Sequence, residues 1–509
     1  MGKLAVAMTV SMWVTPISIL VNRIVPDPYM DEIFHVPQSQ QYCKGNFRNW
    51  DPMITTPPGL YYLSLAYVAS LFPGMFLLQR ASSLLDVCST AILRSVNGAL
   101  AVICSILIHE IIVQLRPTLD RRRAAFYAVI LTLYPLHWFY TFLFYTDAAS
   151  LTVFLAMHLA CLKKKYWLSA LLGALAVLIR QTNIIWMLFV ACGGVVDITL
   201  TMRGNSARVD NFDVSITENG LLSSKNSTAS AGLKKRKAKS TVNITDHSNP
   251  RKGGTTRIED SGLIDEIRTI LLGAWHLKWS LFIHFSPFLL VLIAFVAFVC
   301  WNGSIVLGAK EAHVMSLHFA QMMYFSLISA LASAPLHFTF HHIKAMLSSF
   351  RKSRPLSIYL SFLALIAGLL SVHFFSIAHP YLLADNRHYP FYLWRRVINA
   401  HWSTRYLLVP LYVYSWLSIF NILGKSCKKI WVLGYFMACA AVLIPAPLIE
   451  FRYYTIPFYI LMLHCQIDEG TKWVLMGILY TVVNVFTMWM FLLRPFKSVH
   501  ESGLQRFIW

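Results

Sequence analysis

Apolar segments, most of them about 20 residues long, alternate with short polar segments along most of this chain. A helix needs that length to cross a bilayer, and we predict one spanning helix for each apolar segment. The predicted segments are Leu4–Val21, Ile92–Leu115, Ala124–Phe144, Leu151–Leu162, Tyr166–Ile179, Ile184–Leu200, Ser280–Trp301, His313–Ala334, Leu356–Ile377, Tyr406–Leu423, Ile430–Ile449, Ile456–Ile467 and Trp473–Leu493. The last two segments account for one or two crossings, and the pattern as a whole predicts an all-α polytopic bundle of roughly 11 to 13 transmembrane helices.

Composition supports a membrane location. Of the 509 residues, 57% are hydrophobic and only 13% are charged, and the mean hydropathy is +0.55. A soluble protein cannot bury that much apolar surface, so the bilayer is a predicted partner. The formal charge of +21 lies in short basic clusters between the apolar segments, which is typical of cytoplasmic membrane loops and not of a nucleic-acid-binding surface.

The basic clusters also predict the orientation of the chain. Arg121–Arg123 and Lys163–Lys165 follow alternate segments and are assigned to the cytoplasm. The segment Gly59–Phe76 is apolar but is interrupted by Pro73 and Gly74, and counting it as a span would place Arg121–Arg123 in the lumen. We therefore predict that it lies along the luminal interface.

Three regions follow from this orientation. Residues 1–202 form an amino-terminal membrane half with a luminal loop at 23–57 and an interface helix at 58–78. Residues 203–278 are hydrophilic and lack the apolar content of a core, which predicts a disordered cytoplasmic insert whose sequons at Asn226 and Asn243 stay unglycosylated. Residues 279–509 form a carboxy-terminal membrane half with a luminal loop at 379–403, and the sequon at Asn302 is predicted to be luminal.

The nine cysteines include no CxxC pair. Most of them lie in or beside apolar segments and are predicted to be packing residues. Cys43 and Cys88 both fall on the luminal side, where a disulfide is chemically allowed, but the sequence does not establish that they pair.

Candidate chemistry concentrates in the luminal segment Asp27–Thr56, which carries adjacent carboxylates at Asp31 and Glu32 followed by His35. One interpretation is an ordinary acidic loop. The other is an active-site loop at the membrane surface, in which one carboxylate acts as a general base. Further luminal ionisable groups are Arg180, Asp385, Arg387, His388, Glu450 and Arg452.

These groups suit a particular class of donor. The chain has neither a phosphate-binding Walker A loop nor a dinucleotide-binding GxGxxG motif. Luminal arginine and histidine side chains are suited to hold a phosphate, while a carboxylate takes the proton from an incoming hydroxyl group. Sugar transfer from a polyprenyl phosphate is therefore chemically consistent with the sequence.

Two long strings carry a family resemblance. YMDEIFHVPQSQQYC, followed by WDPMITTPPGLYY, and LLADNRHYPFYLWRR closely resemble signatures of the endoplasmic-reticulum α-1,2-glucosyltransferases that complete the lipid-linked oligosaccharide. VLIRQTN and EFRYYTIP are similar to lesser signatures, and the resemblance runs from Tyr29 to Tyr454 apart from the insert. It implies the helical fold of the C-type glycosyltransferase class, in which a luminal loop carries the catalytic acid and an interface helix follows it.

The resemblance implies a multi-pass protein of the endoplasmic reticulum membrane with a luminal active site. Its donor would be dolichyl phosphate glucose, and its acceptor the diglucosylated Man9GlcNAc2 glycan on dolichyl diphosphate. The product gains a terminal α-1,2-linked glucose by an inverting single displacement, without a metal or other cofactor. The donor in this class is β-linked, so an α-linked product requires inversion. An inverting displacement needs one general base that acts on the acceptor hydroxyl.

The resemblance and the loop position assign residue roles. Asp31 is the predicted base, with Glu32 as the alternative. The predicted ligands of the donor phosphate are Arg387, His388, Arg180 and Arg452, and the predicted substrate contacts are His35, Gln38, Gln41, Trp50, Asp385, Asn386 and Trp394.

Two other functions remain open on the sequence alone. One is a different polyprenyl-phosphate-sugar-dependent transferase of the same class, which only the family strings distinguish. The other is a non-catalytic membrane transporter or partner protein. Transporters usually place ionisable groups near the bilayer midplane and often contain inverted repeats, whereas here the charges gather on one face and no repeat is visible.

Overall fold

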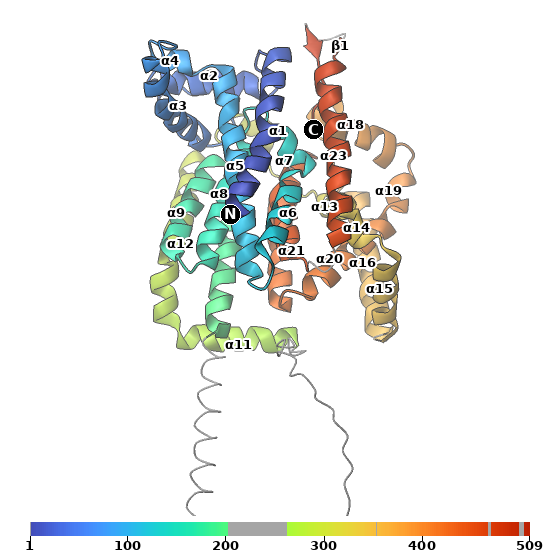
Figure 1. Cartoon of the computed structure of the whole chain (residues 1–509). Helices are drawn as coiled ribbons and strands as arrows, with labels where there is room; N and C mark the ends of the chain where they lie inside the picture. Colours follow the sequence, from blue (N-terminus) through green and yellow to red (C-terminus); the bar gives the residue numbers. More distant parts are fainter. Residues whose placement is uncertain (1, 202–261, 353, 467–469, 498–502) are drawn as a thin grey trace, which may run out of the picture. The chain divides into compact units, whose positions relative to one another are not determined.

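The computed structural model describes residues 2–201, 262–352, 354–466, 470–497 and 503–509, and almost all of its regular structure is helical (Figure 1). The chain divides into two compact units. One consists of Met1–Gly194 with Trp279–Trp509, and the other of Val195–Lys278. The first unit, called the membrane unit below, contains every candidate site residue named above.

The elements of the amino-terminal half are α1 (Gly2–Ile24), α2 (Glu32–Cys43), α3 (Gly59–Leu77), α4 (Leu84–Val87), α5 (Thr90–Leu115), α6 (Arg121–Thr132), α7 (Pro135–Tyr140), α8 (Thr146–Leu162) and α9 (Tyr166–Ile179). A further helix, Asn183–Thr201, follows α9 in the chain.

The elements after residue 277 are α12 (Lys278–Asn302), η1 (Lys310–His313), α13 (Ala320–Ala332), α14 (Ala334–His337), α15 (Phe340–Lys352), α16 (Arg354–Phe374), α17 (Pro380–Ala384), α18 (Tyr389–Leu393), η2 (Trp394–Ile398), α19 (Thr404–Leu407), α20 (Val409–Gly424), α21 (Lys429–Leu443), η3 (Phe451–Tyr454), α22 (Thr455–His464), α23 (Gly470–Leu493), β1 (Phe496–Lys497) and β2 (Leu504–Gln505). The two strands are antiparallel, with Phe496 opposite Gln505.

The apolar helices confirm the predicted fold class. Among the described residues, eight helices are long and apolar enough to cross a bilayer, and four apolar helices are shorter. Only 6% of the apolar window of α12 and 11% of that of α16 are buried within the protein. Lipid must therefore cover these helices, because contact between their apolar side chains and water would cost a large free energy. The chain is a multi-pass membrane protein, while the predicted number of crossings stays a prediction.

One predicted span is in fact two helices. The segment Ala124–Phe144 is divided between α6 and α7, with a break at Tyr134, whose ψ of 123° is not helical. The cause is Pro135, since a proline ring disfavours the helical conformation of the residue before it.

A second predicted span is shorter than expected. Helix α13 begins only at Ala320 and not at His313. The preceding residues run extended, because the backbone N–H groups of Ser316 and His318 donate to the carbonyl oxygens of Pro445 and Ile444 at 3.2 and 2.9 Å. These two bonds give hydrogen-bond donors to carbonyl oxygens just after the end of α21. The last carbonyl groups of a helix have no partners within the helix.

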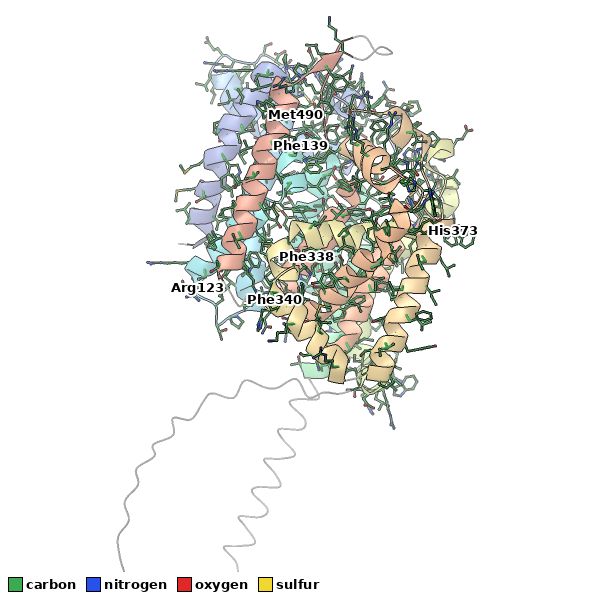
Figure 2. The ribbon with its side chains drawn as sticks, turned by 90° about the vertical axis from the view of Figure 1, so that its right-hand side faces the viewer. Arg123, Phe139, Phe338, Phe340, His373 and Met490 are labelled. Atoms are coloured by element: carbon green, nitrogen blue, oxygen red, sulfur yellow. A yellow bond between two sulfur atoms is a disulfide. The ribbon has the colours of Figure 1, made fainter. Side chains whose placement is uncertain are left out.

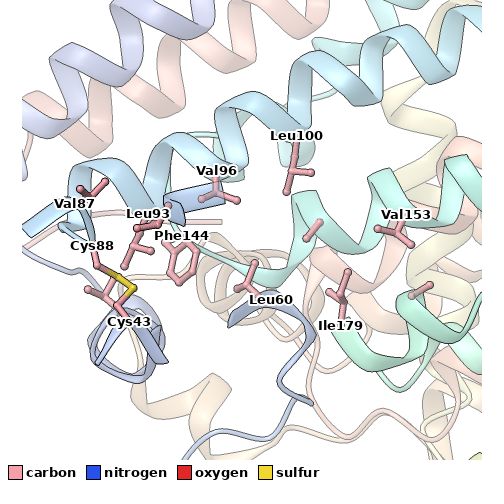
Figure 3. Packing of buried hydrophobic residues seen from close by; sticks show 14 of the residues in the cluster. Cys43, Leu60, Val87, Cys88, Leu93, Val96, Leu100, Phe144, Val153 and Ile179 are labelled. Carbon is pink, nitrogen blue, oxygen red and sulfur yellow. A yellow bond between two sulfur atoms is a disulfide. The ribbon is translucent and has the colours of Figure 1, made fainter. Parts of the chain in front are cut away.

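A buried apolar cluster fixes the elements around the first polar loop. It joins α2 and α3 to α5, α8 and α9, and it includes the fully buried Leu60, Leu93 and Phe144 (Figure 3). A disulfide between Cys43 and Cys88 lies beside it, so the pair that the sequence only allowed is present. Gly59, at the start of α3, is required here, because a Cβ atom would lie 2.5 Å from the carbonyl oxygen of Leu178 in α9.

The polar loops and the basic cluster at Arg121–Arg123 lie at different ends of the membrane unit. Helices α2, α4 and α18 lie toward the same end as β1 (top of Figure 1). Figure 2 shows Arg123, at the start of α6, near the end opposite to Met490, which is close to the carboxyl end of α23. This separation matches the predicted sidedness, in which basic clusters and polar loops face different compartments.

The second unit corrects part of the predicted insert. Leu263–His276 forms the helix α11 and is not structureless. Its amphipathic sequence carries exposed Ile264, Leu271 and Trp275, which is typical of a helix at a membrane surface. The predictions for residues 203–261, including the sequons at Asn226 and Asn243, lie outside the described residues.

Candidate active site

Asp31 stands immediately before α2 in a specialised backbone setting. Its neighbour Met30 adopts a positive φ of 57°, a conformation that side chains other than glycine adopt only at a cost. The backbone N–H of Asp31 donates to the Tyr145 hydroxyl at 3.1 Å. The Asp31 side chain is 40% exposed, so its carboxylate is accessible while its backbone is fixed.

Glu32 has the opposite environment. Its side chain is fully buried and pairs with Arg94, whose Nη2 lies 2.6 Å from Oε2 and whose Nε lies 2.8 Å from Oε1. The same carboxylate accepts backbone N–H groups from Tyr29 at 3.0 Å and Phe144 at 2.6 Å. Every contact of Glu32 is therefore a structural one, and the alternative assignment of Glu32 as the base is not supported by this geometry.

Arg94 extends this buried anchor toward α1. Its guanidinium donates to the carbonyl oxygens of Val25 at 2.6 Å and Asp27 at 3.0 Å, and to Asn22 at 3.1 Å. A buried charge is tolerated when its partners satisfy it in this way. The anchor fixes the whole turn between α1 and α2, and thereby the position of Asp31.

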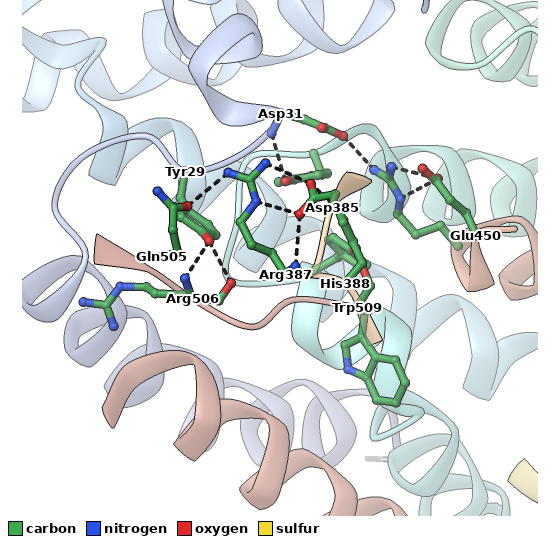
Figure 4. A network of polar contacts seen from close by, with 12 residues as sticks. Tyr29, Asp31, Asp385, Arg387, His388, Glu450, Gln505, Arg506 and Trp509 are labelled. Atoms are coloured by element: carbon green, nitrogen blue, oxygen red, sulfur yellow. Dashed lines mark hydrogen bonds and ion pairs between the residues drawn. The ribbon is translucent and has the colours of Figure 1, made fainter. Parts of the chain in front are cut away.

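Arg452 is surrounded by carboxylates. It lies in η3 and donates from Nη1 to Asp31 at 2.9 Å, and its Nη2 lies 2.8 Å from Glu450 (Figure 4). Asp147 lies 3.8 Å from Nη1, and the rings of Tyr140 and Tyr145 lie 5.5 and 5.4 Å from the guanidinium carbon. Arg452 thus pairs with Asp31 in the structure, and its predicted contact with the donor phosphate remains a prediction.

Arg180 is also paired within the protein. Its Nη1 lies 3.0 Å from Asp147, and both residues line a cavity of only about 20 Å³ that Arg452 shares. Asp147 thus connects the two arginines. The sequence prediction that Arg180 contacts the donor phosphate remains untested, and Arg180 does not line the larger cavity described below.

The loop after α17 supplies the second group of charges. Arg387 forms a two-pronged ion pair with Asp385, with Nε and Nη2 at 2.8 and 2.9 Å from the carboxylate oxygens. Its Nη1 donates to Gln505 at 3.0 Å. His388 lies 3.6 Å from Asp385 and its Nδ1 is 2.9 Å from the carbonyl oxygen of Trp509 (Figure 4). Arg387 and His388 are thus held side by side.

A cavity of about 510 Å³ joins these groups. Its polar lining includes Asp31, Asp385, Asn386, Arg387, His388, Glu450, Arg452 and Gln505, and most of the other lining residues are apolar or aromatic, among them Trp509. Binding sites commonly combine apolar walls with a few convergent polar groups in a cavity of this size. The structure therefore brings together the predicted base, three of the four predicted phosphate ligands (Arg387, His388 and Arg452) and two predicted substrate contacts.

Five predicted substrate contacts do not line this cavity. His35 lies 2.7 Å from the Tyr61 hydroxyl, and Gln38 bridges the backbone of Asn49 and Asp51. Gln41 accepts from Asn46. The other two are Trp50, which packs edge-on against Tyr61, and Trp394, which is 8% exposed.

Electrostatics set the protonation states of the loop. Burial alone would raise the pKa of Asp31, but the attraction of positively charged groups, Arg452 foremost, outweighs it and brings the pKa below the ordinary 3.8. Burial also raises the pKa of Asp385, but the hydrogen bonds from Arg387 outweigh burial, and the pKa of Asp385 is lowered. Burial lowers the pKa of His35, despite the nearby Asp31 carboxylate. At neutral pH Asp31 is therefore ionised and His35 is neutral.

Sequence reasoning missed several residues that build the site. Asp147 and Arg94 are ionisable groups beside or within apolar segments, which is a signal for a functional or structural role in a membrane protein. Gln505 and Trp509 lie in a short segment without periodicity, and no pattern marks them. Among the described residues no three His, Cys, Asp or Glu side chains gather as a metal site would require, and metal-free catalysis stays a prediction.

Comparisons with known proteins agree with the strings that the sequence carries. A family model described as the DIE2/ALG10 family matches residues 25–463. A protein of Arabidopsis thaliana named Dol-P-Glc:Glc(2)Man(9)GlcNAc(2)-PP-Dol alpha-1,2-glucosyltransferase is 57% identical over 512 residues, covering 100% of both chains. Proteins with the same name from Mus musculus and Homo sapiens are 35% and 33% identical, and each alignment covers 96% of this chain and 94% of the relative. No solved structure matches the chain.

Proposed function

The chain belongs to the DIE2/ALG10 family, and from this membership we infer that it is a dolichyl-phosphate-glucose-dependent α-1,2-glucosyltransferase. It transfers glucose from dolichyl phosphate glucose to the diglucosylated Man9GlcNAc2 glycan on dolichyl diphosphate, the reaction that its relatives' name describes. The product carries the terminal α-1,2-linked glucose of the oligosaccharide used for protein N-glycosylation.

Asp31 is the general base of the proposed mechanism. A β-linked donor and an α-linked product require inversion at the anomeric carbon, which a single displacement provides. The acceptor hydroxyl oxygen bonds to that carbon, the bond from the carbon to the phosphate oxygen breaks, and the hydroxyl proton passes to Asp31. A carboxylate of low pKa is sufficient, because the hydroxyl becomes strongly acidic as its oxygen bonds to carbon. The observation that carries this assignment is the accessible carboxylate of Asp31 next to a buried Glu32 that pairs with Arg94.

Arg387 and His388 are the proposed ligands of the donor phosphate. They line the same cavity as Asp31, and a guanidinium group binds phosphate oxygens through paired N–H donors. Charge stabilisation at this point favours departure of dolichyl phosphate, which becomes more negative as the bond to glucose breaks. Arg452 has a different role in this proposal, since it orients Asp31 through the contact at 2.9 Å.

We also propose that the site faces the lumen of the endoplasmic reticulum. The disulfide between Cys43 and Cys88 supports this orientation, because disulfides persist in oxidising compartments. The basic cluster at Arg121–Arg123 supports it independently, because such clusters favour the cytoplasmic side. Dolichyl-linked substrates would then enter from the bilayer while their sugars remain in the lumen.

Complementation of cells that lack the enzyme tests the proposal. Wild-type protein should restore the triglucosylated lipid-linked oligosaccharide, whereas Asp31→Asn should leave the diglucosylated form despite normal expression. Asp51→Asn is a matched control in the same loop, because within the described residues the Asp51 side chain accepts a hydrogen bond from the backbone N–H of Met53 and lies outside the cavity. Full restoration by Asp31→Asn would overturn the assignment of the base, and a complete glycan in cells without the protein would overturn the activity itself.

A further inference from the structure

Residues Gln505–Trp509, called the tail segment here, run beside the loop that carries the proposed phosphate ligands. The backbone N–H of Ile508 donates to the carbonyl oxygen of Arg387 at 2.9 Å, and that of Tyr389 donates to the carbonyl oxygen of Ile508 at 3.1 Å. The tail segment and this loop thereby form a short parallel pairing around His388. Its position is fixed by backbone geometry and not only by side-chain packing.

The tail segment is also tied to two other parts of the membrane unit. Arg506 donates to the carbonyl oxygens of Phe491 and Leu492, in the last turn of α23, at 2.7 and 2.8 Å. The backbone N–H and carbonyl of Arg506 both bond the hydroxyl of Tyr29 at 2.7 Å (Figure 4). The tail segment therefore connects α23, the loop that carries Asp31 and the loop that carries Arg387.

Gln505 makes the contact that matters for chemistry. Its side-chain oxygen accepts from Nη1 of Arg387 at 3.0 Å, and the residue is only 7% exposed. Asp385 occupies Nε and Nη2 of the same guanidinium. The contacts of this planar group therefore include a carboxylate at Nε and Nη2 and a neutral amide at Nη1. A hydrogen bond to a charged group is stronger than one between neutral groups.

The neutrality of Gln505 has a consequence for anion binding. Arg387 already pairs with one carboxylate, Asp385, and a second carboxylate in the place of Gln505 would add one negative charge beside the same guanidinium. A phosphate would then be repelled as it approached the guanidinium. An amide orients Arg387 without that repulsion.

We propose that Gln505 is a positioning residue for donor binding, which holds the guanidinium of Arg387 in the cavity so that it receives the phosphate of the dolichyl-linked donor. This inference rests on the proposed role of Arg387. Trp509 supports the arrangement, since its carbonyl oxygen accepts from the Tyr140 hydroxyl at 2.7 Å and lies 2.9 Å from Nδ1 of His388.

Steady-state kinetics of the full-length protein in detergent, with dolichyl phosphate glucose as the varied donor, tests the proposal. Gln505→Ala should raise the KM for the donor by about tenfold, the effect of losing one hydrogen bond to a charged group. Gln505→Glu should raise it further, while kcat and the KM for the acceptor change less than twofold. Leu504→Ala is the control, because Leu504 is adjacent, 55% exposed and outside the cavity.

The Glu variant separates positioning from simple anchoring. A carboxylate pairs with Arg387 at least as strongly as an amide, so an anchoring role predicts wild-type kinetics for Gln505→Glu, and that result would overturn the proposal. Arg387→Ala distinguishes the two levels of inference. If it raises the donor KM while both Gln505 variants match wild type, only the role of Gln505 falls; if it leaves the donor KM unchanged, the phosphate assignment falls as well.

Discussion

Asp31 and Arg452 are 421 positions apart in the chain, yet a carboxylate oxygen of Asp31 accepts a hydrogen bond from Nη1 of Arg452 at 2.9 Å. The contact joins the first polar loop to the short helix η3, and Glu450 holds the other face of the same guanidinium at 2.8 Å. The proposed base is therefore oriented by a cation that is itself fixed by a second carboxylate. The orientation of the Asp31 carboxylate therefore depends on two polar segments, one from each half of the chain.

This contact predicts a shift in the pH dependence of catalysis. Arg452 lowers the pKa of Asp31 below 3.8 against the opposing effect of burial, so Arg452→Gln should raise that pKa and leave the base protonated at higher pH. The acid limb of kcat/KM should move upward by about 1 pH unit or more, since an adjacent opposite charge typically lowers a carboxyl pKa by 1 to 3. Arg452→Lys, which keeps the charge, should shift the limb less. An unchanged acid limb of kcat/KM in Arg452→Gln would show that Arg452 does not control the pKa of Asp31.

The same pair contributes to stability with a defined sign. The pKa of Asp31 is depressed in the folded protein, so its contribution is present above the unfolded pKa and is lost as the pH falls through the folded value. Thermal unfolding of the detergent-solubilised protein should therefore show a lower Tm in acid. This acid-dependent loss should be smaller in Asp31→Asn, which has no carboxyl group to protonate there, and equal losses in the two proteins would contradict the linkage.

Glu32 is expected to behave as a structural residue. Glu32→Gln leaves the charge of Arg94 buried without a counter-charge, and breaking a buried ion pair in this way costs about 3 to 5 kcal/mol. We expect a marked fall in Tm, with any loss of activity explained by loss of folded protein. A Glu32→Gln variant with wild-type Tm and no transfer would instead identify Glu32 as a chemical participant.

From the sequence, the site could be predicted only where ionisable residues lie between apolar segments. Asp31 and the run from Asp385 to His388 stood out because ionisable residues between apolar segments are uncommon without a role. The same pattern of ionisable residues does not show which of Asp31 and Glu32 is buried. Consecutive residues at the start of a helix point in different directions, and only the position of Arg94 shows which of the two enters the core.

Long-range contacts account for what the sequence could not predict. Gln505 is 118 positions from Arg387, and a lone amide in an irregular segment has no periodicity that would associate it with a site. Gln38 and Gln41 were predicted to contact substrate, and the hydrogen bonds that their side chains make within the loop could not be read from the sequence; their contact with substrate stays a prediction. The helices were more predictable, since the apolar pattern fixes them locally, except where Pro135 and the pairing of Ser316 intervene.

The disulfide between Cys43 and Cys88 should stabilise the loop that carries Asp31. It closes a segment with a sequence separation of 45, and a cross-link of that span stabilises a protein by about 2 to 4 kcal/mol. We expect Cys43→Ser, Cys88→Ser and the double variant to show equal falls in Tm, because each loses the same bond. Unequal falls in the two single variants, or no fall at all, would indicate that the bond is not what holds these residues.

Glycosylation of an introduced sequon tests which side of the membrane the loop faces. Arg48→Thr converts Asn46-Phe47-Arg48 into an acceptor sequence on an exposed part of the loop. If the loop is luminal, the variant expressed in eukaryotic cells should gain mass that an endoglycosidase removes. An Asn46→Gln/Arg48→Thr double variant is the control and should show no change. A sequon that stays unmodified, while Asn46 remains exposed, would place the loop and its Asp31 on the cytoplasmic side.

The natural sequon at Asn302 should behave differently although it was predicted to be luminal. The side-chain nitrogen of Asn302 donates to the carbonyl oxygens of Ser304 and Val306, both at 2.8 Å, and Lys310 donates to its side-chain oxygen at 2.9 Å. A glycan replaces one hydrogen of this nitrogen, so at least one of its two donor bonds at the end of α12 would have to break. We therefore expect Asn302→Gln to migrate like wild type before and after endoglycosidase treatment. A glycan that disappears in this variant would show that the turn forms only after the side chain has been modified or that it opens in the membrane.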